Sequence, residues 1–307
     1  MSSRRTRSVL AAASALTVLA LGVTACSSAD STTGSTGTAA ATSGKIKVVA
    51  STNVWGSVLS AVGGDKVEVT SIIHDPSADP HSYETTAEDA LSAQNSKLLL
   101  GNGGGYDDFF TKLADQAPDA KKLVAYDIAA TGNENEHVWY SLPSVEKVAD
   151  QVAGQLGEVQ PESKQAFLDN ASAFKTKIET LLKKVIDLGV THPGTKVIAT
   201  EPVAHYLLDS AKITDATPPA FSEAVEQETD IPVTAVNEVK QLIAGKQVKA
   251  VVNNAQTTTS ITDQIIGDAK STGIGVVDVT ETLPAGVTDY IDWMSKEVDA
   301  LAGALNS

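Results

Sequence analysis

From Lys45 onward, short runs rich in β-branched residues alternate with longer amphipathic stretches. This alternation is typical of strand–helix–strand units that build a parallel sheet. In the first half we expect strands over residues 46–50, 67–73, 97–100 and 123–126, and helices over 54–62, 87–94 and 106–114. In the second half we expect strands over 196–200, 249–252 and 275–279, and helices over 203–210, 233–244, 260–272 and 289–305. The pattern predicts an α/β fold of two Rossmann-like lobes with mainly parallel sheets.

A long helical pattern joins the two series. No proline or glycine lies between Pro161 and Leu188, and apolar residues recur there at helical spacing. Pro161 fits the first turn of a helix, and Gly189 with Pro193 fits its stop. At ~1.5 Å per residue this helix would span about 40 Å, the height of both lobes, and one stiff connector would restrict opening and closing. We therefore expect an N-terminal lobe over residues 45–158, a linking helix over 159–190 and a C-terminal lobe over 191–307.

The first 25 residues have the form of an export signal. Three arginines precede an apolar run over residues 9–23, which is too short for a membrane span, and small residues follow. Residues 23–26 resemble the lipobox of bacterial lipoproteins, in which cleavage precedes a lipid-modified cysteine, here Cys26. A buried structural cysteine is the alternative. Cys26 is the only cysteine, so no internal disulfide can form and the hydrophobic core must stabilise the protein.

The composition of residues 26–44 and the net charge of the chain give two further expectations. Residues 26–44 are almost uncharged and rich in Ser, Thr, Gly and Ala, which predicts a flexible tether. Removal of the three signal arginines leaves 20 basic and 38 acidic residues, so the net charge changes from −15 to −18. Such a surface repels nucleic acid and mildly favours cations, although acidity also keeps an exported protein soluble.

Two histidines lie in acidic segments between a predicted strand and the next helix. His81 lies in Asp79–Glu84, after a polar loop that two prolines stiffen. A neutral imidazole is the commonest side-chain ligand for zinc and similar metals, and a loop can direct it into a cleft. His74, Asp75 and Asp79 share the loop and are weaker candidates.

The second of these histidines is His137, in the segment 134–139. Trp139 follows two residues later and could shield the imidazole from water. Ser144 has the character of an N-cap, so we expect a helix to begin at Val145.

Carboxylates at the predicted strand ends complete a candidate metal site. Glu201 follows the strand over residues 196–200. Because glutamate is an uncommon N-cap, we expect its carboxylate to have a role other than helix capping, such as metal binding. His205, four residues later, is the alternative. Glu281 lies beyond the carboxyl end of the last strand and can reach the crevice, whereas strand alternation directs Asp278 away from Val277 and Val279.

Other motifs give no support to catalysis. The segment Gly101–Gly105 invites comparison with a phosphate loop, but Tyr106-Asp107-Asp108 follows it in place of Lys-Ser/Thr. The sequence contains no His-Glu-x-x-His or Gly-x-Ser-x-Gly motif. We therefore expect a protein that is not an enzyme.

Taken together, four motifs resemble the zinc/manganese-binding solute receptors of bacterial ABC importers, a family that the chain matches from about Lys45 to its C-terminus. These motifs are Asp79-Pro80-His81-Ser82-Tyr83-Glu84, His137-Val138-Trp139, Thr200-Glu201-Pro202 and Thr280-Glu281-Thr282-Leu283-Pro284. The resemblance implies two lobes joined by one long helix, and one metal ion in the cleft. The ligands it implies are His81, His137, Glu201 and Glu281.

The chain departs from the family pattern at several positions. Glu136 replaces a proline that usually precedes the second histidine, and the His-rich acidic loop of many zinc members is missing. Glu201 stands where many zinc receptors have histidine, and Glu281 where aspartate is frequent, with a one-residue gap in the alignment. Two imidazoles and two carboxylates suit Mn²⁺, whereas intrinsic affinity favours Zn²⁺, so both metals remain open.

The resemblance implies a receptor anchored through Cys26 to the outer face of the cell membrane. It would be a monomer that captures one divalent transition metal ion and delivers it to a permease driven by an ATPase, with no role for nucleic acid. Metal affinity is expected to fall near pH ~6.5, where imidazoles gain a proton. The alternatives are a receptor for an organic solute or an adhesin on the same scaffold, and a metal-dependent hydrolase using His81 and His137.

Overall fold

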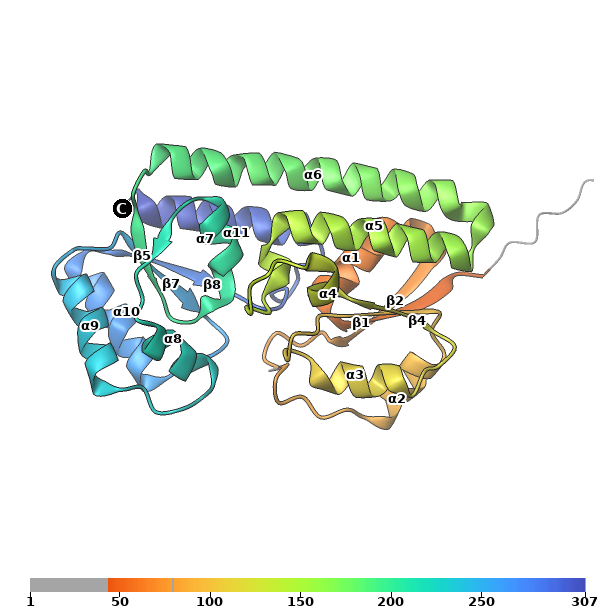
Figure 1. The fold of residues 1–307 in the computed structure, drawn as a ribbon, viewed down its shortest axis with the longest axis horizontal. Helices are drawn as coiled ribbons and strands as arrows, with labels where there is room; N and C mark the ends of the chain where they lie inside the picture. Colours follow the sequence, from red (N-terminus) through yellow and green to blue (C-terminus); the bar gives the residue numbers. More distant parts are fainter. Residues whose placement is uncertain (1–43, 79, 307) are drawn as a thin grey trace, which may run out of the picture. The chain divides into compact units, whose positions relative to one another are not determined.

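The computed structural model describes residues 44–78 and 80–306 (Figure 1). The predicted signal peptide over residues 1–25, the lipidation site Cys26 and nearly all of the predicted tether over residues 26–44 therefore lie outside the described residues, as does Asp79.

The N-terminal lobe contains a four-stranded sheet in which all neighbouring strands are parallel. Its strands are β1 Ile46–Thr52, β2 Val67–Ile73, β3 Leu98–Gly101 and β4 Lys121–Val124, in the order β2-β1-β3-β4. Figure 1 shows α1 and α5 over one face and α2 and α3 over the other. Because helices cover both faces, β1 and β3 are almost entirely buried, and Lys47 is their one exposed residue.

The C-terminal lobe repeats this arrangement. Its strands are β5 Lys196–Ala199, β6 Thr214–Asp215, β7 Ala250–Asn254 and β8 Gly275–Val279, in the order β6-β5-β7-β8 and all parallel. The predicted α/β fold with two parallel sheets is thereby confirmed. In each sheet the chain reverses its direction of winding next to the first strand of the lobe, and ligands of such sheets bind at the carboxyl ends beside this point.

Helices make up most of the remaining described chain. In the N-terminal lobe they are α1 Asn53–Gly63, α2 Ala87–Gln94, α3 Asp108–Asp115, α4 Ala125–Ala129 and α5 Leu142–Val159, with short 3-10 helices η1 Gly64–Lys66 and η2 Val138–Tyr140. In the C-terminal lobe they are η4 Pro202–Ala204, α7 His205–Ser210, α8 Pro219–Glu226, α9 Val233–Ala244, α10 Ser260–Thr272 and α11 Tyr290–Leu305.

The long helix α6, Lys164–Thr191, follows the 3-10 turn η3 Pro161–Ser163 and has 28 residues, or about 42 Å. Its buried apolar stripe packs against α1 and α5 along the first part of the helix and against α7 and α11 along the second (Figure 1). One hydrophobic cluster therefore runs from the inner face of the first sheet through α6 to the inner face of the second. Two smaller clusters lie on the outer faces.

Three local predictions were wrong. The helix α5 begins at Leu142 instead of Val145, because Pro143 occupies its first turn and Ser141 precedes it, so Ser144 lies inside the helix. The fourth strand lies at 121–124 instead of 123–126, and α4 follows it directly.

The predicted stop at Gly189 was also wrong. The helix α6 continues to Thr191, and a Cβ at Gly189 would collide with the backbone of Ala211. The glycine therefore permits close packing between α6 and the segment after α7. The elements β6 and α8 were not predicted at all.

Candidate functional site

All four predicted ligands line one cavity of about 610 Å³. They are His81, His137, Glu201 and Glu281, and each lies on a segment that follows a strand of its lobe. The cavity also carries Glu136, Glu226 and Glu228, and no lysine or arginine is among the described residues that line it. An excess of carboxylates without basic partners gives the cavity a negative potential, which attracts cations.

The four side chains share this cavity but do not form one coordination shell. Among the described residues, the one group of three or more candidate ligands whose atoms all lie within 4.8 Å of one another is Glu136, His137 and Glu226. His81 has an exposed side chain on the loop after β2. It is nevertheless close enough to influence the pKa values of both His137 and Glu201.

His137 is held rigidly at the start of η2, with 1% of its surface exposed. The Asn135 Oδ1 atom accepts hydrogen bonds from the His137 backbone N–H at 2.9 Å and lies 3.2 Å from Nδ1. The Asn135 Nδ2 atom donates to the Pro202 carbonyl at 2.9 Å, which fixes the orientation of the amide. The proton of the neutral ring therefore lies on Nδ1, and Nε2 is left as the atom that can bind a metal.

Aromatic neighbours and burial keep the His137 ring neutral. The ring centroid of Trp139 lies 5.0 Å away and that of Tyr106 6.2 Å away, so the predicted shielding by Trp139 agrees with the structure. Burial, followed by the charges of His81 and His205 when protonated, lowers the pKa of His137 to about 3. A proton therefore does not compete for Nε2 near neutral pH.

The carboxylates Glu201 and Glu281 come from two strands that are not adjacent. β5 precedes Glu201 and β8 precedes Glu281, while β7 lies between them and ends at Asn254. The Asn254 Nδ2 atom donates to Glu201 Oε2 and to Glu281 Oε1, both at 2.7 Å. Each glutamate is 4% exposed, so this amide holds two buried carboxyl groups together.

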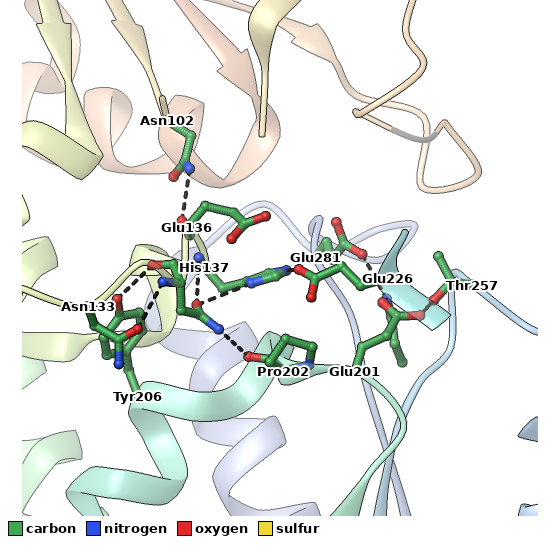
Figure 2. Close-up of polar contacts among 12 residues, drawn as sticks. Asn102, Asn133, Glu136, His137, Glu201, Pro202, Tyr206, Glu226, Thr257 and Glu281 are labelled. Carbon is green, nitrogen blue, oxygen red and sulfur yellow. Dashed lines mark hydrogen bonds and ion pairs between the residues drawn. The ribbon is translucent and has the colours of Figure 1, made fainter. Parts of the chain in front are cut away.

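Burial also changes the proton affinity of Glu201. It raises the pKa to about 7, although hydrogen bonds from Thr257 and Asn254 act in the opposite direction. The Thr257 hydroxyl donates to Glu201 Oε1, so both oxygens of this carboxylate are oriented. Figure 2 shows the His137 ring pointing toward the side chains of Glu201, Glu281 and Glu226.

Gln256 fixes the segment that carries Glu281. Its Oε1 atom accepts from the backbone N–H groups of Glu281 at 2.6 Å and Thr282 at 3.1 Å. Its Nε2 atom donates to the Pro76 carbonyl at 2.6 Å, in the loop that leads to His81. One side chain thus connects the segment of Glu281 to the loop that leads to His81.

The alternative ligands lie elsewhere. His205 Nε2 lies 3.0 Å from Asn133 Nδ2, and Asp278 accepts from Asn253 at 2.8 Å on the exposed side of β8. His74 bonds to carbonyls of its own strand end, and Asp75 caps Ser77. None of these side chains lines the cavity.

Sequence reasoning missed Asn254, Gln256 and Glu226. The first two lie in the polar segment Asn253-Asn254-Ala255-Gln256, directly after the strand expected over residues 249–252, and a site search could have used this signal. Glu226 ends the unpredicted helix α8. Burial, then repulsion from Glu136 and Glu201, raises its pKa to about 8.

Two parallel-sheet lobes joined through one long helix, with an acidic cavity bearing two imidazoles at the carboxyl ends of their strands, define a two-lobed α/β binding protein. The family described as ZnuA, zinc-uptake complex component A, periplasmic, matches residues 48–304. The chain belongs to this family, which confirms the resemblance seen in its motifs.

Named relatives and solved structures agree with this assignment. The iron ABC transporter substrate-binding lipoprotein MtsA of Streptococcus pyogenes is 30% identical over 166 residues, 49% of this chain and 53% of MtsA. The metal ABC transporter substrate-binding lipoprotein ScbA of Streptococcus cristatus is 29% identical over 192 residues, 57% of this chain and 60% of ScbA. The chain thus spans little more than half the length of these relatives.

The fold is shared with two solved binding proteins. The periplasmic zinc-binding protein TroA from Treponema pallidum superposes with a TM-score of 0.72 at 16% identity, over 85% of this chain and 99% of TroA. The protein FpvC from Pseudomonas aeruginosa, solved with Mn²⁺, gives 0.69 at 18% identity, with 85% and 99% covered.

Proposed function

We propose that this chain is an extracytoplasmic receptor that binds one divalent transition metal ion, zinc or manganese, and delivers it to an ABC-type permease. The observation that carries the proposal is the pairing of the two carboxylates bridged by Asn254 with the buried, neutral ring of His137 in one acidic cavity. Its relatives are named as substrate-binding lipoproteins of metal ABC transporters, which supports the same function.

The proposed ligands are His81 and His137 from the N-terminal lobe and Glu201 and Glu281 from the C-terminal lobe. Two nitrogen and two oxygen donors accept either Zn²⁺ or Mn²⁺, and intrinsic affinity favours Zn²⁺. His137 meets a requirement of any such ligand, because its Nε2 lone pair is available at neutral pH.

For one ion to contact all four ligands, their atoms must come closer together. The continuous core and the hydrogen bond from Gln256 to Pro76 oppose a large separation of the lobes. His81, in contrast, is exposed on a loop. We infer that movement of this loop, with small lobe displacements, completes the coordination shell and later releases the metal.

The membrane anchor is part of the same proposal. Residues 1–25 would be a signal peptide, Cys26 the lipidated residue and residues 26–44 a tether at the outer face of the cell membrane. The folded part would comprise lobes over residues 45–158 and 191–307 with a linking helix over 159–190. The structure offers no spanning helix among its described residues. The partners would be a permease and its ATPase, with the receptor acting as a monomer.

A receptor for an organic solute is the second candidate, and the cavity disfavours it. An organic anion would meet several carboxylates and no described basic side chain. A hydrolase would show turnover of esters or phosphates that is lost in His81→Ala. An adhesin would bind a macromolecule.

Isothermal titration calorimetry with Zn²⁺ and Mn²⁺ on chelator-stripped protein tests the proposal. We expect one ion per chain, and at least ~100-fold weaker binding in His81→Ala and His137→Ala. His74→Ala is the matched control, because His74 lies in the loop that leads to His81 but outside the cavity, and this variant should bind like the wild type. Absence of binding of both metals below the millimolar range would refute the proposal.

A further inference from the structure

We infer that the cavity contains a second metal position, formed by Glu136, His137 and Glu226, which a divalent ion occupies on its way to or from the four-ligand site. The inference rests on the proposed function, because His137 belongs to both positions. A single ion would move between the positions, so the stoichiometry would remain one per chain.

Geometry singles out these three residues. One ligand atom from each lies within 4.8 Å of the other two, and His137 Nε2 is 3.9 Å from Glu226 Oε1. Donors at about 2.1 Å from a tetrahedrally coordinated ion lie about 3.4 Å apart. A contraction of about half an ångström would bring His137 Nε2 and Glu226 Oε1 to this spacing, and one of at most about 1.4 Å would do so for all three atoms.

The His137 ring and the backbone of Glu136 are held in place by their neighbours. Asn135 orients the buried His137 ring so that Nε2 faces the cluster. The carbonyl of Glu136 accepts a hydrogen bond at 2.9 Å from Asn102, whose Oδ1 accepts from Trp55 at 3.2 Å. The position is thus built on a fixed backbone.

The carboxyl of Glu226 lies in an unfavourable place for a negative charge. Glu226 is the last residue of α8, and a carboxylate at a helix C-terminus is repelled by the exposed carbonyls. A carboxylate oxygen of Glu226 also lies within 4.8 Å of one of Glu136, in a cavity that has no described basic lining residue. A bound cation would compensate the charges of both carboxylates. Their approach to His137 is therefore consistent with a cation position.

The exposure of the carboxylates indicates the order in which an ion would reach the two positions. Glu136 and Glu226 are half-buried, whereas Glu201 and Glu281 are 4% exposed. An ion from solvent would therefore meet the Glu136–His137–Glu226 position before it reaches the buried carboxylates, and His137 would transfer it between them (Figure 2).

Titration with Co²⁺, followed by its visible absorption, separates the two positions. The Glu201→Gln/Glu281→Gln variant removes half of the four-ligand site and should still bind one Co²⁺. Addition of Glu226→Gln should weaken that binding at least ~10-fold, whereas Glu223→Gln, an exposed glutamate of the same helix, should not. Equal Co²⁺ binding by the two triple variants, one with Glu226→Gln and one with Glu223→Gln, would overturn the inference. Loss of all Co²⁺ binding in the Glu201→Gln/Glu281→Gln double variant would also overturn it.

A kinetic measurement on the otherwise native site provides the second test. In stopped-flow transfer of Zn²⁺ from a chromophoric chelator, Glu226→Gln should slow association at least ~10-fold, while Glu223→Gln leaves the rate unchanged. An unchanged rate in Glu226→Gln contradicts the inference but leaves the proposed function intact. If the wild-type protein takes up neither Zn²⁺ nor Co²⁺, the proposed function fails, and the inference fails with it.

Discussion

Glu201 and Glu281 are joined by a single amide group, because Asn254 Nδ2 donates to a carboxylate oxygen of each at 2.7 Å. The two glutamates are 80 positions apart in the chain. Their approach depends on the sheet order, in which β7 separates β5 from β8. The amide preorganises two buried oxygen donors that would otherwise repel each other.

Replacement of this amide should therefore weaken metal binding. Asn254→Ala is expected to lower affinity for Zn²⁺ by about 10–100-fold, because the carboxylates lose the donor that positions them. Calorimetric titration measures the effect. Asn253→Ala is the control, since Asn253 bonds to Asp278 instead of to the proposed ligands. Wild-type affinity in Asn254→Ala would show that the bridge has no role in binding.

Carboxylates, rather than His137, should govern the pH dependence of binding. The pKa of Glu201 is raised to about 7, so protons compete with the metal below that pH, whereas His137, with a pKa of about 3, stays neutral. As pH falls from 8 to 6, affinity should decline, and Glu201→Gln should reduce the slope by about one proton. Titrations across this range in several buffers measure it. An identical slope in both proteins would exclude Glu201 as the titrating group.

Glu297 should make the folded protein less stable as pH rises. Burial raises its pKa to about 8, despite a hydrogen bond from Trp293 at 2.9 Å. The folded state therefore binds the proton more tightly than the unfolded state, whose pKa is near 4.5. This contribution to stability is complete below pH 4.5 and is lost progressively up to pH 8, and the loss at pH 7 is at most ~3 kcal/mol.

Urea unfolding at pH 5 and pH 8 tests this expectation. Glu297→Gln keeps an acceptor for Trp293 and removes the titration, so its unfolding free energy should vary less between the two pH values than that of the wild type. The wild type and the variant should therefore differ most at pH 8. Parallel pH profiles would mean that Glu297 does not titrate in this range.

Two glycine substitutions test the packing of α6. Gly189→Ala should lower the unfolding free energy by about 1–3 kcal/mol, because the new Cβ meets the backbone of Ala211. Gly154→Ala in α5 has no atom within 4 Å of the new Cβ and should stabilise the protein by about 0.5–1 kcal/mol. Thermal and urea unfolding of both variants measure the difference. A neutral Gly189→Ala would contradict the close contact.

Local periodicity was sufficient to predict much of the fold. The expected bounds of β2, β8, α2, α9 and α10 coincide with those observed, because each has a clear apolar period and polar or glycine boundaries. Gly189 shows where such reasoning fails. Its sequence context resembles a helix stop, but its role depends on Ala211, which approaches only in the folded protein.

The same distinction applies to the cavity. His81, His137, Glu201 and Glu281 could be selected from sequence, because segments after parallel strands converge at one edge of the sheet. The polar segment that holds Asn254 could also have been selected, but its contact with both glutamates could not be predicted, because that contact follows from the order of β5, β7 and β8. Glu226 was missed together with α8, which begins with proline and has only eight residues, little more than two turns, so its apolar period is short.

X-ray absorption at the zinc K-edge of the Zn²⁺-loaded protein tests the central claim most directly. We predict scattering from two imidazoles and two carboxylate oxygens at about 2.0–2.1 Å. One imidazole should be lost in His81→Ala and one in His137→Ala, and none in His74→Ala. A spectrum with oxygen ligands alone, or one that these substitutions leave unchanged, would contradict the proposed site.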